Sequence, residues 1–575
     1  MNPEPILGID LGTTNSLVGV VDSGFPILLA DEHGERSTPS AVSYGAEKLV
    51  GATALRQRAL NPASTVTSVK RLIGRRGGES EWRPAYDLKT LGVTPVEVSA
   101  EILKRLKSIA ERALEQKVSR AVITVPAFFN DAQRAATKKA GELAGLSVER
   151  ILSEPTAAAL AYGLDKLGEH QKVAVFDLGG GTFDISVLEM RDGVFQVLAT
   201  AGDTQLGGDD LDRALAAHIA QRLNLAANDM RVVEAAEAAK KRLSVDEETV
   251  FDGLTITRAD LEKIAKPWLE RTRIHCLRAL SDAGVQAGDL DEVILVGGST
   301  RMPLVRQFVA ELFGKEPNTS QNPDEAIALG ATIQAGILSG SLRQVLLLDV
   351  TPLSLGIETF GGLMNIIIPR NTTIPAKAGE MFTNAVANQD AMLIRILQGE
   401  RELAKDNWEL GRIEVPFPPG PKGSARVGVQ FSLDADGILN VLARDTVTNT
   451  DTTLEIRGTA IDVEDERVEQ MIAESVEYAF EDMNERIWTE ARMKAEELLP
   501  AVEAALEQLG SEITESESAE VRAQAAEVRA LLDSADHDAK ALKSATQKLD
   551  DATQTLAVML IDRAMEESLV RRGLV

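Results

Sequence analysis

The sequence predicts a multidomain protein with a duplicated α/β region of two lobes, then a β-sandwich, then a helical part. The first observation is a phrase that occurs twice, at residues 6–18 (ILGIDLGTTNSLV) and 173–185 (VAVFDLGGGTFDI). Short β-rich runs with Pro and Gly turns follow position 351, and apolar residues recur at helical spacing after position 462. The expected boundaries are 1–342 for the α/β region, 343–350 for a linker, 351–458 for the sandwich and 459–575 for the helices.

Each copy of the phrase predicts a β-hairpin with a polar tip, because an apolar strand ends in Asp10 or Asp177 and resumes after a turn. Such turns suit phosphate, since glycine lets backbone amides approach an anion and threonine adds hydroxyl donors. The turn residues are Gly12, Thr13, Thr14, Gly179, Gly180, Gly181 and Thr182. The two carboxylates would repel phosphate unless a hard cation such as Mg²⁺ or a water lay between. One copy alone would be an ordinary turn, but two with matching flanks favour a cleft between two phosphate-binding hairpins.

Composition excludes several classes of partner. The formal net charge of −27 argues against nucleic acid, which requires a basic surface. Cys276 is the sole cysteine, so no intramolecular disulfide can form; we expect it to be a small buried side chain in a reducing compartment. No apolar run has the length of a membrane helix and no signal peptide is evident, so we expect a cytoplasmic protein without a membrane partner.

Local patterns predict further elements. Helices are expected at 100–115 and 132–144, and a glycine turn at 293–303 (VILVGGSTRMP) should lead into a helix with Ser299 or Thr300 near its cap. The apolar run at 345–349 is either an ordinary buried strand or a linker that docks on a neighbouring domain. Asp436-Gly437 predicts a hairpin turn, preferred over a calcium loop because acidic ligands are missing. Pro500 is expected to break or kink a helix after Leu499.

Known nucleotide motifs are missing. No Gly-x-x-x-x-Gly-Lys-Ser/Thr segment exists, and no glycine turn follows the dinucleotide fingerprint. A phosphate-binding cleft therefore requires a different nucleotide fold.

Four stretches closely resemble the heat-shock protein 70 family of DnaK-type chaperones: residues 8–16 (GIDLGTTNS), 125–131 (VPAFFND), 177–184 (DLGGGTFD) and 349–358 (DVTPLSLGIE). The resemblance runs nearly end to end. It implies an actin-like duplicated ATPase domain, a β-sandwich that binds peptides and an α-helical lid. It further implies an ATP-dependent chaperone that holds extended apolar segments of unfolded proteins, with ATP and Mg²⁺ as cofactors and K⁺ as a further candidate.

The same resemblance implies roles for residues in the cleft. The catalytic group would comprise Lys70 near the terminal phosphate, Glu154 near the attacking water, Thr182 at the γ-phosphate, and Asp10 and Asp177 holding Mg²⁺ through water. The remaining nucleotide contacts would come from Gly12, Thr13, Thr14, Asn15, Gly179, Gly180, Gly181, Glu237, Lys240, Lys241, Ser244, Gly297, Gly298, Ser299, Arg301 and, near the base, Asp324. Taken alone, the helix carrying Glu237 to Ser244 is typical of a solvated charged face.

The resemblance also implies a peptide site and a coupling surface. The peptide would lie between loops, with Phe360 and Ala385 forming an arch over it and Ile357, Phe382, Met392 and Ile394 lining a pocket; sandwich core is the alternative for these residues. Coupling and J-domain co-chaperone binding are implied for Pro126, Arg134, Arg150, Leu346, Leu347, Leu348 and Asp349.

Departures from the family pattern change what we expect for signalling between domains, peptide preference and the exchange factor. Phe128 stands where the family usually has tyrosine, which implies weaker signalling between domains, and Met392 replaces a commonly smaller residue, which implies a shifted peptide preference. Shorter stretches at 76–98 and 223–257 make a GrpE-type exchange factor doubtful.

Alternative functions remain at this stage. The chain's end resembles the HscA-like branch that serves iron–sulfur cluster assembly. An actin-fold sugar kinase would lack residues 351–575, and a nucleotide-sensing adaptor would not need Lys70, Glu154 and Thr182 together. We therefore expect a monomeric, peptide-binding ATPase.

Overall fold

The structure, a computed structural model, describes residues 4–74, 84–163, 170–226, 229–342, 345–455, 479–534 and 536–571. The chain separates into two compact units, each described here by itself. The first comprises Met1–Gly356, Ile366–Gln398 and Glu409–Gln470, and the second Ile357–Asn365, Gly399–Trp408 and Met471–Val575.

The first lobe of the first unit is built on a sheet with strand order β3-β2-β1-β8-β9, to which β4 is added beside β2. Strand β1 pairs antiparallel with β2 and parallel with β8. The predicted first hairpin is therefore confirmed, and Asp10 lies opposite Leu17 near its tip. The strands are β1 (Ile6–Leu11), β2 (Asn15–Asp22), β3 (Phe25–Leu28), β4 (Thr38–Pro39), β8 (Arg120–Val125) and β9 (Ser147–Ser153).

The second lobe repeats the arrangement with strand order β15-β10-β11-β12-β16-β19. Strand β10 pairs antiparallel with β11, which confirms the second hairpin, and Asp177 lies opposite Asp184. The strands are β10 (Gln171–Leu178), β11 (Phe183–Arg191), β12 (Val194–Asp203), β15 (Glu292–Val296), β16 (Leu346–Val350) and β19 (Thr373–Ile374). The two hairpins thus occupy equivalent positions in two similar sheets.

Two helices pack closely where the lobes meet, α5 (Glu154–Gly163) and α10 (Ala326–Ser339). A Cβ on Gly330 would lie 1.8 Å from the carbonyl oxygen of Ala157, and a Cβ on Gly8 of β1 would lie 2.2 Å from the backbone nitrogen of Thr332. Only glycine permits these backbone approaches. They fix the start of β1, and hence Asp10, against the helices between the sheets.

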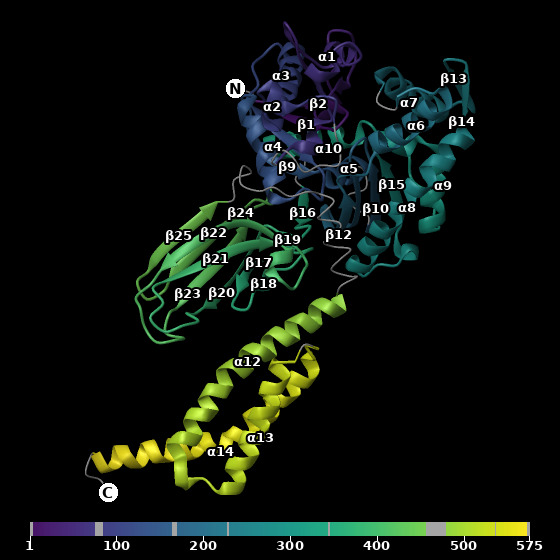
Figure 1. Cartoon of the computed structure of the whole chain (residues 1–575). Helices are drawn as coiled ribbons and strands as arrows, with labels where there is room; N and C mark the ends of the chain where they lie inside the picture. The colour runs from purple at the N-terminus through teal and green to yellow at the C-terminus, as the bar shows by residue number, and fades with distance from the viewer. Residues whose placement is uncertain are drawn as a thin grey trace. The chain divides into compact units, whose positions relative to one another are not determined.

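The other helices of these lobes lie beside the two sheets or at the outer ends of the lobes (Figure 1). The expected helices at 100–115 and 132–144 are present as α3 and α4, and α3 begins with a capping box formed by Thr94 and Glu97. These helices are α1 (Ala52–Gln57), α2 (Leu88–Leu91), α3 (Pro95–Leu114), α4 (Asp131–Leu143), α6 (Gly208–Leu223), α7 (Met230–Leu243), α8 (Arg258–Ala283) and α9 (Pro303–Phe313). Small sheets are formed by β5 (Ala41–Tyr44), β6 (Lys48–Val50) and β7 (Thr65–Thr67), and by β13 (Glu248–Phe251) and β14 (Leu254–Thr257).

Short 3₁₀ segments connect elements within the described parts of the lobes. They are η1 (Pro62–Ser64), η2 (Val69–Leu72), η4 (Ala287–Asp289) and η5 (Gly298–Arg301). Cys276 is buried in α8, as expected, and burial raises the pKa of its thiol.

Residues 355–455 form two four-stranded sheets, with strand orders β18-β17-β21-β22 and β20-β23-β24-β25. In the second sheet, β23 pairs with β24 and Leu433 lies opposite Leu439, so the predicted Asp436-Gly437 hairpin is present. The elements are β17 (Leu355–Thr359), β18 (Leu363–Ile368), β20 (Ala376–Phe382), β21 (Ala391–Gln398), η6 (Ala404–Asp406), β22 (Trp408–Pro416), β23 (Val427–Leu433), β24 (Leu439–Asp445) and β25 (Thr450–Glu455).

The described residues of the second unit include the long helices α12 (Ala479–Leu509), α13 (Glu515–Leu532) and α14 (Ala539–Arg571), with η7 (Gly510–Glu512) after α12. They share a core that includes Trp488, Leu509, Val528 and Leu549. The prediction that Pro500 breaks the helix is wrong, since α12 continues through this residue to Leu509. The apolar positions predicted between 462 and 478 lie outside the described residues.

Within the second unit, Arg401 Nε donates to Asp482 Oδ2 at 2.6 Å, which anchors the start of α12 on the segment Gly399–Trp408. Over the described residues, every helix is either too short or too polar to cross a bilayer.

Candidate functional site

A cavity of about 820 Å³ lies between the two lobes, where the tips of both hairpins meet. It is lined by the predicted catalytic residues Asp10, Lys70, Glu154, Asp177 and Thr182. Every predicted nucleotide contact also lines it except Gly181. Gly181 instead packs behind the turn, where an added Cβ would lie 2.6 Å from Thr13 Cγ2 and 2.9 Å from Arg71 Nε.

The first hairpin holds Asp10 almost fully buried. Thr124 Oγ1 of the neighbouring strand β8 donates to Asp10 Oδ1 at 2.9 Å. At the tip, a Cβ on Gly12 would lie 2.1 Å from the carbonyl oxygen of Asn15, so glycine is required for this turn. Ser40 Oγ donates to the Gly12 carbonyl at 2.8 Å and fixes the turn from outside.

The second hairpin holds Asp177 in the matching position. A Cβ on Gly180 would lie 2.0 Å from Thr14 Oγ1, so the tips of the two hairpins touch through a position that only glycine can fill. Asp177 Oδ2 is buried and has no hydrogen-bond partner among the described residues. An unsatisfied buried carboxylate oxygen is costly, which indicates that a donor or cation belongs there.

Lys70 and Glu154 form a buried ion pair between Lys70 Nζ and Glu154 Oε1. Lys70 lies in η2, where the chain turns after β7, and Glu154 is the first residue of α5. The two side chains are 5% and 7% exposed, so their charges act in a medium of low dielectric constant. The ammonium group also lies 5.8 Å from the centroid of the Phe129 ring.

The cavity has an excess of buried negative charge. Burial, followed by the nearby carboxylate of Glu154, raises the pKa of Asp10 to about 7. Burial and the same neighbour raise the pKa of Asp177 well above its usual range, and that of Asp184 to about 8. Lys70 opposes all three shifts but does not offset them. A bound cation would restore the balance.

These residues fit a hydrated Mg²⁺ ion. Asp177 Oδ2 is unsatisfied and the pKa values of Asp10 and Asp177 are raised, so a cation between the two carboxylates would stabilise their charged forms. Among the described residues, no three His, Cys, Asp or Glu side chains converge to ligate a metal directly. Mg²⁺ commonly retains several waters and takes one or two carboxylates, so Asp10 and Asp177 would hold it through water.

Charged residues from α7 and from the turn after β15 surround the far end of the cavity. Arg301 Nη2 donates to Asp324 Oδ2 at 2.6 Å, and Lys240 Nζ to Asp212 Oδ2 at 2.7 Å. Burial alone would raise the pKa of Glu237, but Lys241 and Arg58 lower it to about 2. Glu237, Lys240, Lys241 and Ser244 all face the cavity, so the helix is not simply a solvated charged face.

The predicted helix cap at Ser299 or Thr300 is wrong. Residues Gly298–Arg301 form the 3₁₀ segment η5, and α9 begins only at Pro303, without a side-chain cap. Ser299 Oγ instead donates to the carbonyl of Gly179 at 2.9 Å, and Thr300 Oγ1 to that of Gly297 at 2.7 Å. Ser299 therefore ties this turn to the second hairpin.

The segment 207–212 (GGDDLD) was missed by sequence reasoning. At the start of α6, the Gly208 N–H donates to the carbonyl of Gly179 at 3.0 Å and the Asp209 N–H to that of Gly180 at 2.8 Å. Asp209 and Asp212 line the cavity. The signal was available, because a glycine pair before a helix is typical of a tight turn near a functional site; here the amides of Gly208 and Asp209 bond to the second hairpin.

The apolar run at 345–349 forms strand β16, which pairs parallel with β12 through Leu346, Leu347 and Leu348. Leu347 is 8% exposed and Leu346 is 53% exposed. Asp349 then pairs with Ile374 of β19, so β16 joins the second lobe to the β-rich segment.

The coupling residues Pro126 and Arg134 are buried, and Arg150 is half-buried. Arg134 donates to the carbonyls of Phe129 and Ala127 at 3.1 Å and to that of Asp436 at 3.4 Å.

The Asp436 turn contacts the first lobe, which sequence reasoning missed. Its Oδ2 accepts from Lys138 Nζ at 2.6 Å and its Oδ1 from the Ile151 N–H at 3.0 Å. Asp131 Oδ1 accepts from the Leu439 N–H at 2.6 Å. The turn is thus an interaction site as well as a hairpin.

The predicted peptide contacts differ in exposure. Ile357 and Ile394 are buried, Phe382, Ala385 and Met392 are half-buried, and Phe360 is 65% exposed. Ile357 and Phe360 belong to the second compact unit and the other four to the first. Half-burial leaves Met392 able to serve both the sheet core and a surface pocket.

A family model described as Hsp70 protein matches residues 6–562 of the 575-residue chain. The match takes in the hairpins that end in Asp10 and Asp177, the cavity between them, strand β16, both four-stranded sheets and most of helices α12, α13 and α14. The chain therefore belongs to the Hsp70 family.

Proposed function

We propose that this chain acts as Hsp70 proteins generally do, as a chaperone and ATPase that binds ATP with Mg²⁺, unfolded peptides and co-chaperones. For this chain we propose a specific cycle: ATP hydrolysis in the cavity closes the helical lid over an extended apolar segment of a client protein. We further propose that it works in the cytoplasm with a J-domain co-chaperone. The observation that carries this proposal is the meeting of both hairpins and the Lys70–Glu154 pair in one cavity.

The cavity residues suit a triphosphate. Gly12, Gly179 and Gly180 line the cavity, and a glycine backbone lets its amide groups approach a phosphate closely. Lys70 would place its ammonium group beside the terminal phosphate, where it stabilises charge that develops as the phosphoryl group leaves. Glu154 holds Lys70 in place and orients the attacking water. Mg²⁺ would neutralise phosphate charge, with Asp10 and Asp177 accepting hydrogen bonds from its waters.

The output of the cavity would be carried by β16. This strand pairs with β12 in the sheet that contains the second hairpin, so movement of the second lobe changes the edge on which Leu347 packs. We propose that ATP favours the paired strand and that hydrolysis favours its release, two states with different affinity for peptide.

The test is single-turnover ATP hydrolysis with and without an apolar peptide. Removing the Thr182 hydroxyl in Thr182→Ala removes a donor to the γ-phosphate and should slow hydrolysis about 10- to 100-fold. The matched control is Thr53→Ala, whose exposed hydroxyl bonds only the Val50 carbonyl. Wild-type protein that hydrolyses no ATP would refute the proposal.

Peptide binding is tested in the same assay with Met392→Trp. The larger side chain should fill the half-buried pocket and abolish stimulation by peptide, without changing basal hydrolysis. Met381→Trp, on exposed β20, is the control. An unaltered response to peptide in Met392→Trp would place the peptide elsewhere.

A further inference from the structure

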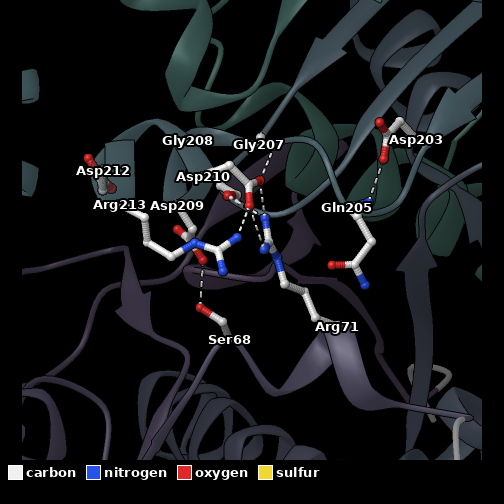
Figure 2. Close-up of polar contacts among 12 residues, drawn as sticks. Ser68, Arg71, Asp203, Gln205, Gly207, Gly208, Asp209, Asp210, Asp212 and Arg213 are labelled. Carbon is white, nitrogen blue, oxygen red and sulfur yellow. Dashed lines mark hydrogen bonds and ion pairs between the residues drawn. The ribbon is translucent and has the colours of Figure 1, made fainter. Parts of the chain in front are cut away.

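Four side chains join the two lobes beside the phosphate-binding turns, and we call them the clasp: Ser68, Arg71, Asp209 and Asp210. Ser68 Oγ donates to Asp209 Oδ2 at 2.7 Å. Arg71 makes a bidentate pair with Asp210, Nη1 to Oδ1 at 3.1 Å and Nη2 to Oδ2 at 2.6 Å (Figure 2). Ser68 and Arg71 belong to the first lobe, and both aspartates to the start of α6 in the second.

The clasp is the most buried of the ion-pair contacts described between the two lobes. The Arg71 side chain is 0% exposed and that of Asp210 is 14% exposed. Arg58–Glu237 is 19% and 24% exposed, and Arg36–Glu325 is 56% and 24% exposed. Exposed pairs contribute little, whereas separating a buried pair leaves charges without partners. Among these ion pairs, the clasp therefore opposes opening of the lobes most strongly.

The clasp is bonded to the groups that would hold phosphate. The carbonyls of Gly179 and Gly180 accept from the amides of Gly208 and Asp209, and Asp210 Oδ2 accepts from the Gly207 N–H at 2.8 Å. On the other side, Arg71 directly follows Lys70 in η2. A movement of the first lobe that separates Arg71 from Asp210 therefore also carries Lys70 away from the second hairpin.

We infer that the clasp positions Lys70 against the second hairpin and determines how long a nucleotide is retained between the lobes. This inference rests on the proposed function, since it concerns the same cavity. The residues are positioning residues: Arg71 and Asp210 act through the two turns that they hold together. Because the clasp exists only when the lobes are closed, its loss lowers nucleotide affinity by the same factor that it lowers the population of the closed state.

Ser68 offers a mild way to weaken the clasp. It has a φ of 52°, in the left-handed region that serine rarely adopts, and its hydroxyl is bonded to Asp209. Ser68→Ala removes the bond and keeps the backbone strain, whereas Ser68→Gly removes both. If the hydrogen bond retains the nucleotide, the two variants should behave alike.

The experiment measures dissociation of a fluorescent ADP analogue by stopped-flow chase with excess ATP. Arg71→Gln and Asp210→Asn should each raise the dissociation rate at least tenfold, and the double variant should resemble the singles because one interaction is lost in all three. The matched control is Arg213→Gln, which removes the half-exposed partner of Asp210 on its own helix and should change the rate less than twofold. Ser68→Ala and Ser68→Gly should both raise it about threefold.

Three results would overturn the inference. The first is a wild-type rate in Arg71→Gln and Asp210→Asn; the second is a rise confined to Ser68→Ala. The third is a fall in the melting temperature of nucleotide-free protein without faster dissociation, which indicates a merely structural pair. If the pair variants do not fold, the Ser68 variants decide. Wild-type protein that binds no analogue at all would overturn both the proposed function and the clasp.

Discussion

Buried carboxylates are the residues that determine the chemistry of the cavity. Asp10 and Asp177 could be predicted from sequence because each ends an apolar strand in a repeated phrase. Lys70 and Glu154 were reached only through the family resemblance, since nothing local distinguishes them. Asp184, Asp209 and Asp212 were not predicted, because their surroundings arise when segments distant in sequence approach one another. Asp184, for example, accepts from the Phe128 N–H at 3.1 Å.

The raised pKa of Asp10 predicts how stability depends on pH in the absence of Mg²⁺ and nucleotide. The pKa is about 7 in the folded protein against 3.8 in the unfolded chain, so between these values the folded state holds a proton that the unfolded chain has released. Wild-type stability should therefore fall as pH rises from about 4 to about 7.

Asp10→Asn should remove this contribution. The variant should be more stable than wild type at pH 8, by on the order of 2–4 kcal/mol, and the difference should shrink towards pH 5. Thermal unfolding at both pH values without Mg²⁺ measures it. A difference that is the same at both values would contradict the assignment.

At the scale of elements, sequence patterns correctly predicted the helices and hairpins whose formation depends on nearby residues. The two hairpins and helices α3 and α4 follow from apolar periodicity and turn residues. The helix cap at Ser299 was wrong because the turn tightens into a 3₁₀ segment and Ser299 bonds to the Gly179 carbonyl. The break at Pro500 was wrong because α12 packs along its length on α14, and this packing outweighs the proline's local preference.

The two faces of strand β16 differ in burial, which predicts different effects of substitution at Leu346 and Leu347. Leu347 packs among Val197, Val350 and the core around Tyr162, whereas Leu346 is 53% exposed. Leu347→Asp should release the strand from β12 and reduce stimulation of hydrolysis by peptide at least fivefold. Leu346→Asp, the neighbouring position on the other face, should have a much smaller effect. Equal effects of the two substitutions on the stimulated rate would show that burial of the strand is not what couples the domains.

At the scale of the whole molecule, sequence reasoning predicted the order of parts and the location of the cavity. It could not predict that β16 adds to the sheet of the second lobe or that the Asp436 turn bonds to Lys138 and Ile151 of the first. Such pairings depend on which surfaces meet after each part has folded. They connect the two lobes to the β-rich segment, so a movement of the lobes on binding ATP can be transmitted to the proposed peptide site.

We propose that the nucleotide bound in the cavity controls how tightly the protein holds a peptide. The most direct measurement is the dissociation rate of a fluorescent apolar peptide, with ADP and then with ATP and Mg²⁺. We predict at least a tenfold faster release with ATP, and no acceleration in Leu347→Asp. Equal release rates of wild-type protein in the two nucleotides would contradict the account.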